Sequence, residues 1–468
     1  MFKKLTTFGN AVSIAGIVVT VGLTATPTAH AESAAPIYAD SPEGRALIAD
    51  VLAHNSELQI SEVAVAQSRS VQREVRAGYL PSVDVDFRYT KLWGGLDLGS
   101  LFNPAYAALN QITGSAQFPT DISIKLPFAL DTKVRLTQPL YVPQLAGAAR
   151  LAAIDTRGKQ IAVAITHREL VAAARKIHLG VAQTREVVAV LQTTRGLLVE
   201  NLRISQLLVD TQKATQDTVL RATAQLAAHD QKLRSAQDAV RALQRQLAVL
   251  RSDANDPAAG EAPVPTAAPS ALPVIPSDVN ALVALAQQRR SELRGAAVRT
   301  DAAAAQAALV RQGRLPTVAV ALDLGVQSSS LDASWDNKYA ALSLVASWNI
   351  FDGGKRAARA TQAALARQAA TATDAQTRAQ IAADVRTVWD HARTARDAIA
   401  TIDSRIESER AAYELLNTRF VAGGVPQIEV LAAQTALISA QLERVLAVAE
   451  LQQQMVELAR VTEEAEQL

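Results

Sequence analysis

The sequence predicts an α+β fold in which one tandem-duplicated chain supplies four β-strands and two long helical hairpins. The first observation is an internal repeat: residues 46–85 recur as residues 281–320, at a constant offset of 235 and without a gap. The second is a set of long segments with apolar residues at heptad spacing, and the third is a set of short segments in which polar and apolar residues alternate. The repeat indicates two equivalent halves of one pseudosymmetric body, and the two periodicities indicate coiled-coil helices and half-buried strands.

The repeat is carried by identical residues in the two halves. Ala46-Leu47, Ser56-Glu57-Leu58, Arg76, Gly78, Leu80-Pro81, Val83 and Val85 recur as Ala281-Leu282, Ser291-Glu292-Leu293, Arg311, Gly313, Leu315-Pro316, Val318 and Val320. We therefore expect a signal segment at residues 1–31, a first structural repeat at 32–252, a linker at 253–278 and a second structural repeat at 279–468.

The N-terminal segment has the three parts of a secretory signal peptide. Lys3-Lys4 precede an apolar stretch at residues 11–25, and Ala29 and Ala31 are the small residues of a cleavage site. An uncleaved anchor helix is the alternative, but glycine and threonine residues keep the apolar run shorter than a membrane span. Because the chain contains no cysteine, the acylated cysteine of a lipoprotein is absent and no disulfide is expected.

The composition excludes several classes of function. Removal of the signal peptide leaves 45 basic and 45 acidic residues, so no basic field for nucleic acid exists. The histidines are scattered without metal-ligand spacing, and no phosphate-binding loop, nucleophile elbow or paired-carboxylate cleft is present. We therefore expect neither an enzyme nor a bound metal or cofactor.

The helical segments fit together by length. A long limb at residues 144–211 spans about 100 Å at 1.5 Å per residue, whereas the limb that returns along it, residues 216–251, reaches about half of that length. A single helix expected at residues 44–78 has about the missing length, so we expect it to stack end to end with the short limb beside the long one. In the second repeat, residues 279–313 and 427–465 are expected to stack in the same way.

Four segments are expected to form strands, because polar and apolar residues alternate in them: residues 82–91, 133–138, 318–324 and 342–348. Thirteen of the 19 aromatic residues lie within residues 79–141 or 335–351, as in an interfacial aromatic girdle, although aromatic residues also favour strands in general. Four strands cannot close a membrane barrel, and open edges are not tolerated in lipid. If these strands cross a bilayer, several protomers must therefore pool them.

Two connecting segments have the composition of irregular structure. Residues 92–131 form a connection longer than its counterpart in the second repeat, and Gly94-Gly95, Asn103-Pro104 and Phe118-Pro119 suggest a surface loop. The linker at residues 253–278 is rich in proline and alanine, which favours an extended and solvated chain. On the helix that follows the last strand, Trp389 is expected to pack against a neighbouring helix.

Motifs at the helix–strand boundaries suggest a family. Gly78-Tyr79-Leu80-Pro81 and Gly313-Arg314-Leu315-Pro316 are in register. At the ends of two predicted strands lie Gln138-Pro139-Leu140-Tyr141 and Trp348-Asn349-Ile350-Phe351-Asp352-Gly353-Gly354-Lys355-Arg356. With these motifs the chain resembles the TolC-type outer membrane efflux protein family over nearly all of its mature length. The resemblance implies a homotrimer in which twelve pooled strands form one outer-membrane barrel, continued by a long periplasmic barrel of helices.

The resemblance also implies roles for particular residues. Helix-to-strand junctions would lie at Leu80-Pro81 and Leu315-Pro316, and the return to helix at Phe351, Asp352, Gly353 and Gly354. Two helical tips would dock a periplasmic adaptor protein: Lys213, Ala214 and Thr215 in the first repeat, and Gly423, Gly424, Val425 and Pro426 in the second. Acidic side chains just inside the tips would line a constriction, with Glu429 at the matching position and Asp217 nearby. The alternatives are a hairpin turn without a partner at the second tip, and solvated carboxylates at helix starts for both acids.

The function implied is that of an outer-membrane exit duct in a Gram-negative bacterium. It would accept substrate from an inner-membrane RND or ABC transporter through the adaptor, and pass it outward by diffusion. The duct of a type I protein secretion system is an alternative with the same fold. A soluble periplasmic coiled-coil scaffold is an alternative of another class.

Overall fold

The computed structural model describes the chain between residues 38 and 463 with a few gaps. The described residues are 38, 40–91, 96–123, 125–126, 130–253, 272–328, 337–422 and 424–463. The expected signal peptide, with Ala29 and Ala31, lies outside these residues.

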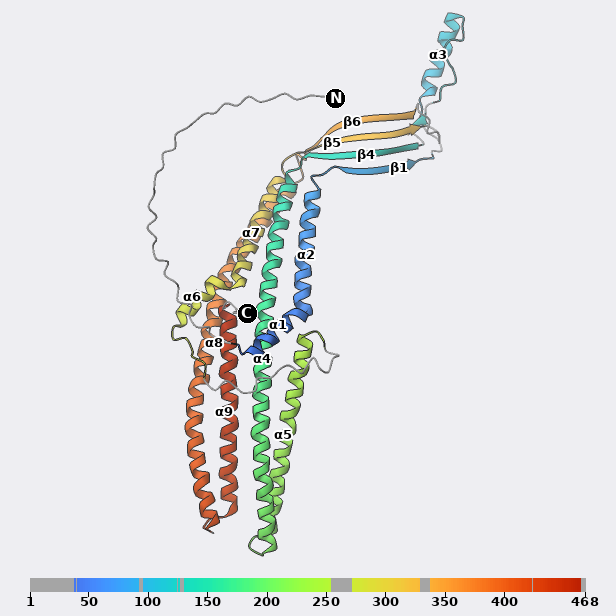
Figure 1. The fold of residues 1–468 in the computed structure, drawn as a ribbon. Helices are drawn as coiled ribbons and strands as arrows, with labels where there is room; N and C mark the ends of the chain where they lie inside the picture. The colour runs from blue at the N-terminus through green and yellow to red at the C-terminus, as the bar shows by residue number, and fades with distance from the viewer. Residues whose placement is uncertain are drawn as a thin grey trace, which may run out of the picture. The chain divides into compact units, whose positions relative to one another are not determined.

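The first half of the chain supplies five helices and four strands, and the second half supplies four helices and two strands among the described residues (Figure 1). In chain order these are α1 (Pro42–His54), α2 (Ser56–Ala77), β1 (Ser82–Tyr89), β2 (Leu96–Asp97), α3 (Gly99–Thr113), β3 (Lys125–Leu126), β4 (Leu130–Tyr141), α4 (Pro143–Asp210), α5 (Gln216–Leu250), α6 (Val279–Arg289), α7 (Ser291–Gln312), β5 (Thr317–Ser328), β6 (Lys338–Ser347), α8 (Lys355–Val421) and α9 (Gln427–Thr462).

The internal repeat of the sequence corresponds to a repeat of the structure. Helices α2 and α7 both have 22 residues, and their first and last residues are separated by the same offset of 235 that relates the two sequence segments. Each is preceded by a shorter helix, α1 or α6, and followed by a strand, β1 or β5. Gly78 and Gly313, at the same offset, end the two helices with closely similar backbone angles (φ −61° and −63°).

The prediction of one continuous helix at residues 44–78 was wrong, because the helix is interrupted at Asn55. This residue has extended backbone angles, and its side chain accepts a hydrogen bond from the amide of Leu58 (3.0 Å), as an N-cap does. The side-chain nitrogen Nδ2 of Asn55 also donates to the carbonyl of Leu250, the last residue of α5 (2.7 Å). The second repeat is broken at the equivalent position, Arg290. The apolar pattern continues through both breaks, so periodicity alone did not reveal them.

The expected end-to-end stacking is present in both repeats. Helix α2 begins where α5 ends: the amide of Ser56 donates to Ser252 Oγ (2.8 Å), and Arg251 forms an ion pair with Asp50 (2.7 Å). In the second repeat, Arg290 donates to the carbonyl of Val461 near the end of α9 (3.1 Å). Helices α2 and α5 both pack against α4, while α7 and α9 both pack against α8. Each long helix therefore has two shorter helices along its length.

The four longer strands form one antiparallel sheet in the order β1-β4-β5-β6. The pairing is continuous: Ser82 to Tyr89 of β1 pair with Thr137 to Leu130 of β4, and Thr317 to Val326 of β5 pair with Ser347 to Lys338 of β6. The central pair, β4 and β5, joins the two repeats, with one irregularity near Pro139. The strands expected from alternation are therefore all present.

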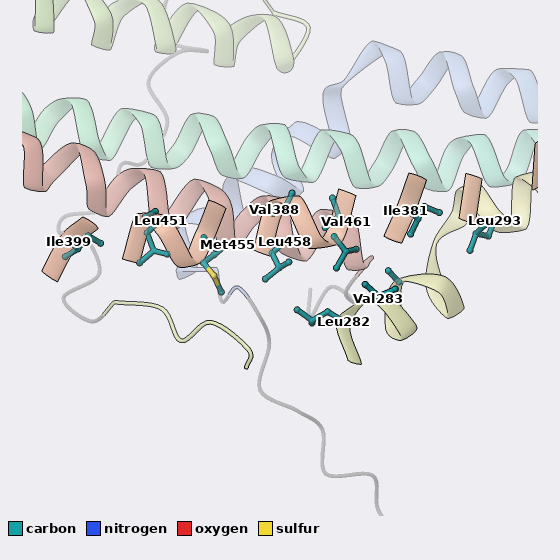
Figure 2. Packing of buried hydrophobic residues seen from close by; sticks show 14 residues of the cluster. Leu282, Val283, Leu293, Ile381, Val388, Ile399, Leu451, Met455, Leu458 and Val461 are labelled. Atoms are coloured by element: carbon teal, nitrogen blue, oxygen red, sulfur yellow. The ribbon is translucent and has the colours of Figure 1, made fainter. Parts of the chain in front are cut away.

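The hydrophobic core lies at the level where the stacked helices meet. Its largest cluster joins α6, α7, α8 and α9, and Figure 2 shows Leu451, Met455 and Leu458 of α9 among its members. A smaller cluster joins α1, α4 and α5 through residues that include Val51 and Leu247.

The expectation of a solvated linker at residues 253–278 was wrong for its final residues. Leu272 and Ile275 pack against the large core cluster. Trp389 of α8 donates through Nε1 to the carbonyl of Pro276, and Arg396 donates to the carbonyl of Pro273, both at 2.7 Å. Trp389 therefore fixes the chain that leads into α6, and the indole nitrogen has a partner, as a half-buried tryptophan requires. Residues 254–271 lie outside the described part of the chain.

The expected surface loop at residues 92–131 also differs from the structure, which contains the 15-residue helix α3. The Asn103-Pro104 pair taken as a loop signal lies inside this helix, where Pro104 removes one backbone hydrogen bond without ending the helix. Among the described residues, none of the helices combines the length and the apolar character that a membrane-spanning helix needs.

Candidate functional site: a two-faced sheet and two helical tips

The β1-β4-β5-β6 sheet has one apolar face and one charged face. In an antiparallel sheet, directly paired residues lie on the same face, so the register defines rows across the four strands. One row is Val83, Leu136, Leu322 and Leu342, and the next on the same face is Val85, Val134, Leu324 and Ala340. The rows between them belong to the other face: Asp84, Arg135, Asp323 and Ala341, and then Asp86, Lys133, Gly325 and Tyr339.

The apolar face is left open by the residues that the structure describes. Val85 and Phe87 of β1 are each 70% exposed, and Leu342 and Leu344 of β6 are 76% and 70% exposed. A contiguous apolar surface of this kind marks a region that contacts lipid or another protein. We define these outward residues of the four strands as the apolar sheet face.

The charged face is held by pairs between neighbouring strands. Arg135 of β4 donates through Nε and Nη2 to the two carboxylate oxygens of Asp323 on β5, each at 2.7 Å. Asp84 and Asp86 of β1 lie opposite Arg135 and Lys133 in the register. This alternation of charge from strand to strand stabilises the register, because a shift by one residue would bring charges to the apolar face.

Gly325 shows how closely the strands pack on the charged face. A Cβ atom at this position would lie 2.7 Å from the carbonyl oxygen of Thr132 and 2.8 Å from the ring of Tyr339. The residue is therefore glycine because the neighbouring backbone and the aromatic ring occupy the space of a side chain.

The junction residues lie between helix and strand at the positions the sequence indicated. Leu80-Pro81 separate α2 from β1, and Leu315-Pro316 separate α7 from β5. At the start of α8, Gly353 and Gly354 have positive φ angles of 65° and 86°, which glycine adopts without strain. Phe351 is 85% exposed.

Asp352 organises the return from strand to helix. Its carboxylate accepts hydrogen bonds from the backbone amide of Arg356 (3.0 Å) and from the Nε of the same residue (2.9 Å). The Arg356 guanidinium also donates to the carbonyls of Asn349 and Ile350. The aspartate and arginine of the motif therefore tie the turn to the first helical turn.

The first tip, between α4 and α5, turns without a glycine. Gln212 has a φ of 58°, and the amides of Lys213 and Ala214 donate to the carbonyl of Leu208 (2.8 and 3.1 Å), which ends α4. Lys213 and Thr215 are exposed, whereas Ala214 is half-buried.

At the second tip, between α8 and α9, the amide of Gly424 donates to the carbonyl of Arg419 (2.8 Å), and Pro426 stands at the N-cap of α9. Gly423 lies outside the described residues, and Val425 is half-buried.

Only one of the two candidate constriction residues lines the groove between the two tips. Asp217 lines a groove of about 970 Å³ between α5 and α9, together with Arg221, Pro426 and Ile428, whereas Glu429 is not among the residues that line it. A hydrogen bond from Thr215 lowers the pKa of Asp217, and Arg221 lies 3.5 Å away and adds to this effect. Glu429 lies in the first turn of α9 with its side chain exposed. Asp217 therefore has the local partners of a helix-start carboxylate.

A buried ionic cluster that sequence reasoning missed joins α4, α7 and α9. Glu292 accepts two hydrogen bonds from Arg168 (2.6 and 2.9 Å) and two from Arg290 (both 2.8 Å), and these arginines are only 8% and 6% exposed. Glu463, at the end of α9, contacts Arg168 at 3.4 Å and bonds to Ser291. We call these five residues the junction cluster.

The junction cluster changes the acidity of Glu292. Burial raises its pKa, but the hydrogen bonds from Arg168 and Arg290 outweigh burial and lower it to about 2. The only sequence signal was the position of Glu292, which is the repeat counterpart of Glu57. Arg290 is two residues away, but Arg168 of α4 and Glu463 at the end of α9 lie far away in the sequence, and no pattern connects them with Glu292.

In the part of the chain that the structure describes, no three histidine or carboxylate side chains lie close enough together to hold a metal ion. His229 instead contacts the carbonyl of Leu191 (2.8 Å) within the α4–α5 hairpin.

Comparison with known proteins supports the fold and the family. Residues 282–463 match the outer membrane efflux protein family. Among solved structures, a membrane protein from Pseudomonas aeruginosa is 15% identical with a TM-score of 0.75, and the match covers 90% of this chain and 92% of that one. VceC, an outer membrane protein from Vibrio cholerae, is 16% identical with a TM-score of 0.72, over 90% of this chain and 96% of that one.

The MtrE outer membrane channel from Neisseria gonorrhoeae, described in its open state, is 16% identical with a TM-score of 0.68, over 90% of this chain and 89% of that one. At these identities the likeness concerns the fold. No curated protein matches the chain by sequence.

Proposed function

Through residues 282–463 the chain belongs to the outer membrane efflux protein family, and we propose that it forms the outer-membrane exit duct of a tripartite efflux system. The resemblance inferred from the boundary motifs is thus confirmed, and the fold is that of outer-membrane channels. Such channels conduct substrates and are not enzymes. Transport through the duct would be passive, with the energy supplied by an inner-membrane pump.

The apolar sheet face carries this proposal. Its rows of valine, leucine and phenylalanine, backed by rows of aspartate, arginine and lysine, are the alternation that a transmembrane strand requires when one face contacts lipid and the other a water-filled lumen. A soluble scaffold would leave this surface in water at a large cost in free energy.

Closure of the barrel requires further copies of the chain. The sheet has β1 at one edge and β6 at the other, and neither edge has a strand partner within the described protomer. Unpaired backbone groups in lipid cost several kcal/mol each, so each edge must pair with another protomer. Neighbouring strands in the order β1-β4-β5-β6 are all antiparallel, so β1 and β6 run in opposite directions. The β6 strand of one protomer can therefore pair antiparallel with β1 of the next. A homotrimer would then supply twelve strands.

The helices would continue the barrel into the periplasm. They leave the end of the sheet at which β1 begins and β4 ends, and the two helical tips lie at the far ends of α4 and α8 (Figure 1). We place the docking of a periplasmic adaptor at these tips, with Lys213, Ala214 and Thr215 in one and Gly424, Val425 and Pro426 in the other; Gly423 would belong to the second. An RND or ABC transporter would complete the system.

The direct test is the mass and conductance of the purified protein. Extracted from membranes with detergent, it should have the mass of a trimer and should form ion-conducting pores in planar bilayers. Recovery as a soluble monomer without detergent would exclude the channel and favour a periplasmic scaffold. The duct of a type I secretion system has the same fold, and the transporter with which the protein co-purifies separates the two: a pump for small molecules or an exporter with a protein substrate.

Charge reversal at the first tip should abolish export without disturbing assembly. Lys213 is exposed and follows the residue with positive φ, so Lys213→Glu changes the charge of the tip but not its turn. We expect drug resistance to fall to the level of the deletion strain, with the trimer intact on native gels. Lys159→Glu, at an exposed position near the other end of α4, is the matched control and should leave resistance unchanged. Full resistance in Lys213→Glu cells would argue against docking at this tip.

Removal of the Glu429 carboxylate should change conductance or cation preference, if three copies of this residue face one another at the constriction. Like charges held close together attract cations, so Glu429→Ala should shift the reversal potential toward weaker cation preference in asymmetric salt. Glu429→Gln, which keeps the size of the side chain, should give the same shift. Recordings identical to the wild type would show that Glu429 lies outside the constriction.

A further inference from the structure

The helix α3 lies in a long uncharged segment. Residues 98–120 contain no aspartate, glutamate, lysine, arginine or histidine, whereas a fifth of the whole chain is charged. The segment nevertheless has a defined structure, in which α3 and the returning residues 115–123 are joined along their length.

Two asparagines hold the inner face of α3. Asn103 donates to the carbonyl of Ile122 (2.8 Å) and accepts from its amide (2.9 Å), and Asn110 bonds in the same two ways to Phe118 (2.7 and 2.9 Å). These residues are seven apart and therefore lie on one side of the helix. On the flank of this side, the ring of Tyr106 lies 5.6 Å from that of Phe118. Contacts within the protomer thus hold the inner face of α3 against residues 118–122.

The opposite face carries a stripe without a partner in the described protomer. Leu101, Ala105, Ala108 and Ile112 follow one another at intervals of four, three and four residues, which is the spacing of a coiled-coil seam. Leu101 is 72% and Ile112 is 81% exposed. The two alanines between them leave room for the close approach of another helix. We call these four residues the α3 stripe.

The position of α3 in the chain brings it to a boundary between protomers. α3 follows β1, which is the edge strand of the sheet, and β1 runs away from α2, so the segment belongs to the end of the sheet opposite the helical body. The second repeat has a much shorter connection there, with β5 ending at Ser328 and β6 beginning at Lys338. Each protomer therefore contributes one such helix, next to the seam at which a neighbouring protomer would join.

We propose that the α3 stripes of neighbouring protomers pack against one another and narrow the outer mouth of the channel. This inference rests on the trimer of the proposed function. Because the segment carries no charge, identical surfaces can meet without repulsion, as contact between like copies requires. The heptad spacing lets the side chains of one α3 helix insert between those of the next, and the exposed Leu101 and Ile112 provide the apolar contact.

The surface of the bilayer is the other possible occupant of an apolar helix face, and the composition argues against it. Helices that lie on membranes are rich in lysine and arginine on their polar face, where they contact anionic head groups. α3 has no basic residue, and the charged residues that flank the uncharged segment are Asp97 and Asp121. Lipid phosphate would repel these two carboxylates.

Single cysteines test the contact directly, because the natural chain has none. Ile112→Cys, treated in intact cells with a short bis-maleimide, should give a covalent dimer on denaturing gels, since one linker can join two of the three copies. Thr113→Cys lies one residue further around the helix, is also exposed, and should give little product. A trimer of normal mass without cross-linking at residue 112 would overturn the proposal but leave the channel intact, whereas a monomer would remove both.

Conductance provides a second and independent test. Ile112→Asp places like charges at the contact and does not touch the folded core, so it should raise single-channel conductance relative to both the wild type and the Thr113→Asp control. Unchanged conductance would contradict the narrowing of the mouth. Fluorescence of a probe on Ile112→Cys, if quenched by spin-labelled lipid in reconstituted vesicles, would assign the stripe to the membrane and exclude the contact between copies.

Discussion

Leu342→Arg should prevent the protein from assembling in the outer membrane. Leu342 lies near the middle of β6 on the apolar sheet face, pairs with Leu322 and is 76% exposed in the protomer. An arginine on the lipid face of a barrel costs about 2–4 kcal/mol near the bilayer midplane. A trimer carries the substitution three times, so the total cost is of the order of the whole stability of a typical domain. We expect degradation or periplasmic aggregates in place of membrane-bound trimers, measured by sucrose-gradient fractionation and heat-modifiable gel mobility.

The neighbouring residue gives a matched control. Ser343 is next in the same strand, is also exposed, and lies on the charged face, where its partner is Ala321. Ser343→Arg should therefore assemble normally, because its side chain would extend into the lumen among the existing aspartates. Equal assembly of both variants would mean that the apolar sheet face does not contact lipid, and the proposed barrel would be wrong.

The contrast between these neighbours explains why the sheet could be predicted from the sequence. Alternation with a period of two is a local property, so Ser-Val-Asp-Val-Asp-Phe-Arg-Tyr at residues 82–89 predicts the strand and its two faces together. The heptad spacing of the long helices is also a local pattern, and the offset of 235 can be counted directly from the sequence. The stacking of the shorter helices followed from their lengths alone.

The features that were missed depend on contacts between distant residues. The break at Asn55 is fixed by a bond to Leu250, and the break at Arg290 by one to Val461. The two breaks occupy equivalent positions in the repeat, but a neutral amide caps one junction and an ionic cluster fills the other. Nothing in the sequence near Glu292 indicates that Arg168 lies beside it. The helix in residues 92–131 was missed because its glycine and proline residues are typical of loops. The contacts that hold it, from Asn103 and Asn110 to the backbone of residues 118–122, join residues that no local pattern connects.

The junction cluster leads to the second large effect: Arg168→Met should destabilise the helical body by about 3–5 kcal/mol, the usual result of removing one partner from a buried ion pair. Methionine retains much of the apolar stem, so the loss comes chiefly from Glu292 and Glu463, whose carboxylates remain with fewer partners. Urea unfolding followed by helical circular dichroism should measure it. Arg195→Met removes a more exposed ion pair, between Arg195 of α4 and Asp230 of α5, and should cost far less stability.

Acid sensitivity separates the lost ion pair from a simple packing defect. The folded-state pKa of Glu292 is about 2 against an ordinary value of 4.5, so its ionised form stabilises the folded protein above pH 4.5. This contribution is lost as the pH falls from 4.5 through 2. Without Arg168 the pKa is lowered less, so Arg168→Met should lose less stability than the wild type over this window. The double variant Arg168→Met/Glu292→Gln should recover part of the lost stability at neutral pH, because no ionised carboxylate then remains at position 292. If the double variant were less stable than Arg168→Met alone, packing and not charge would account for the effect.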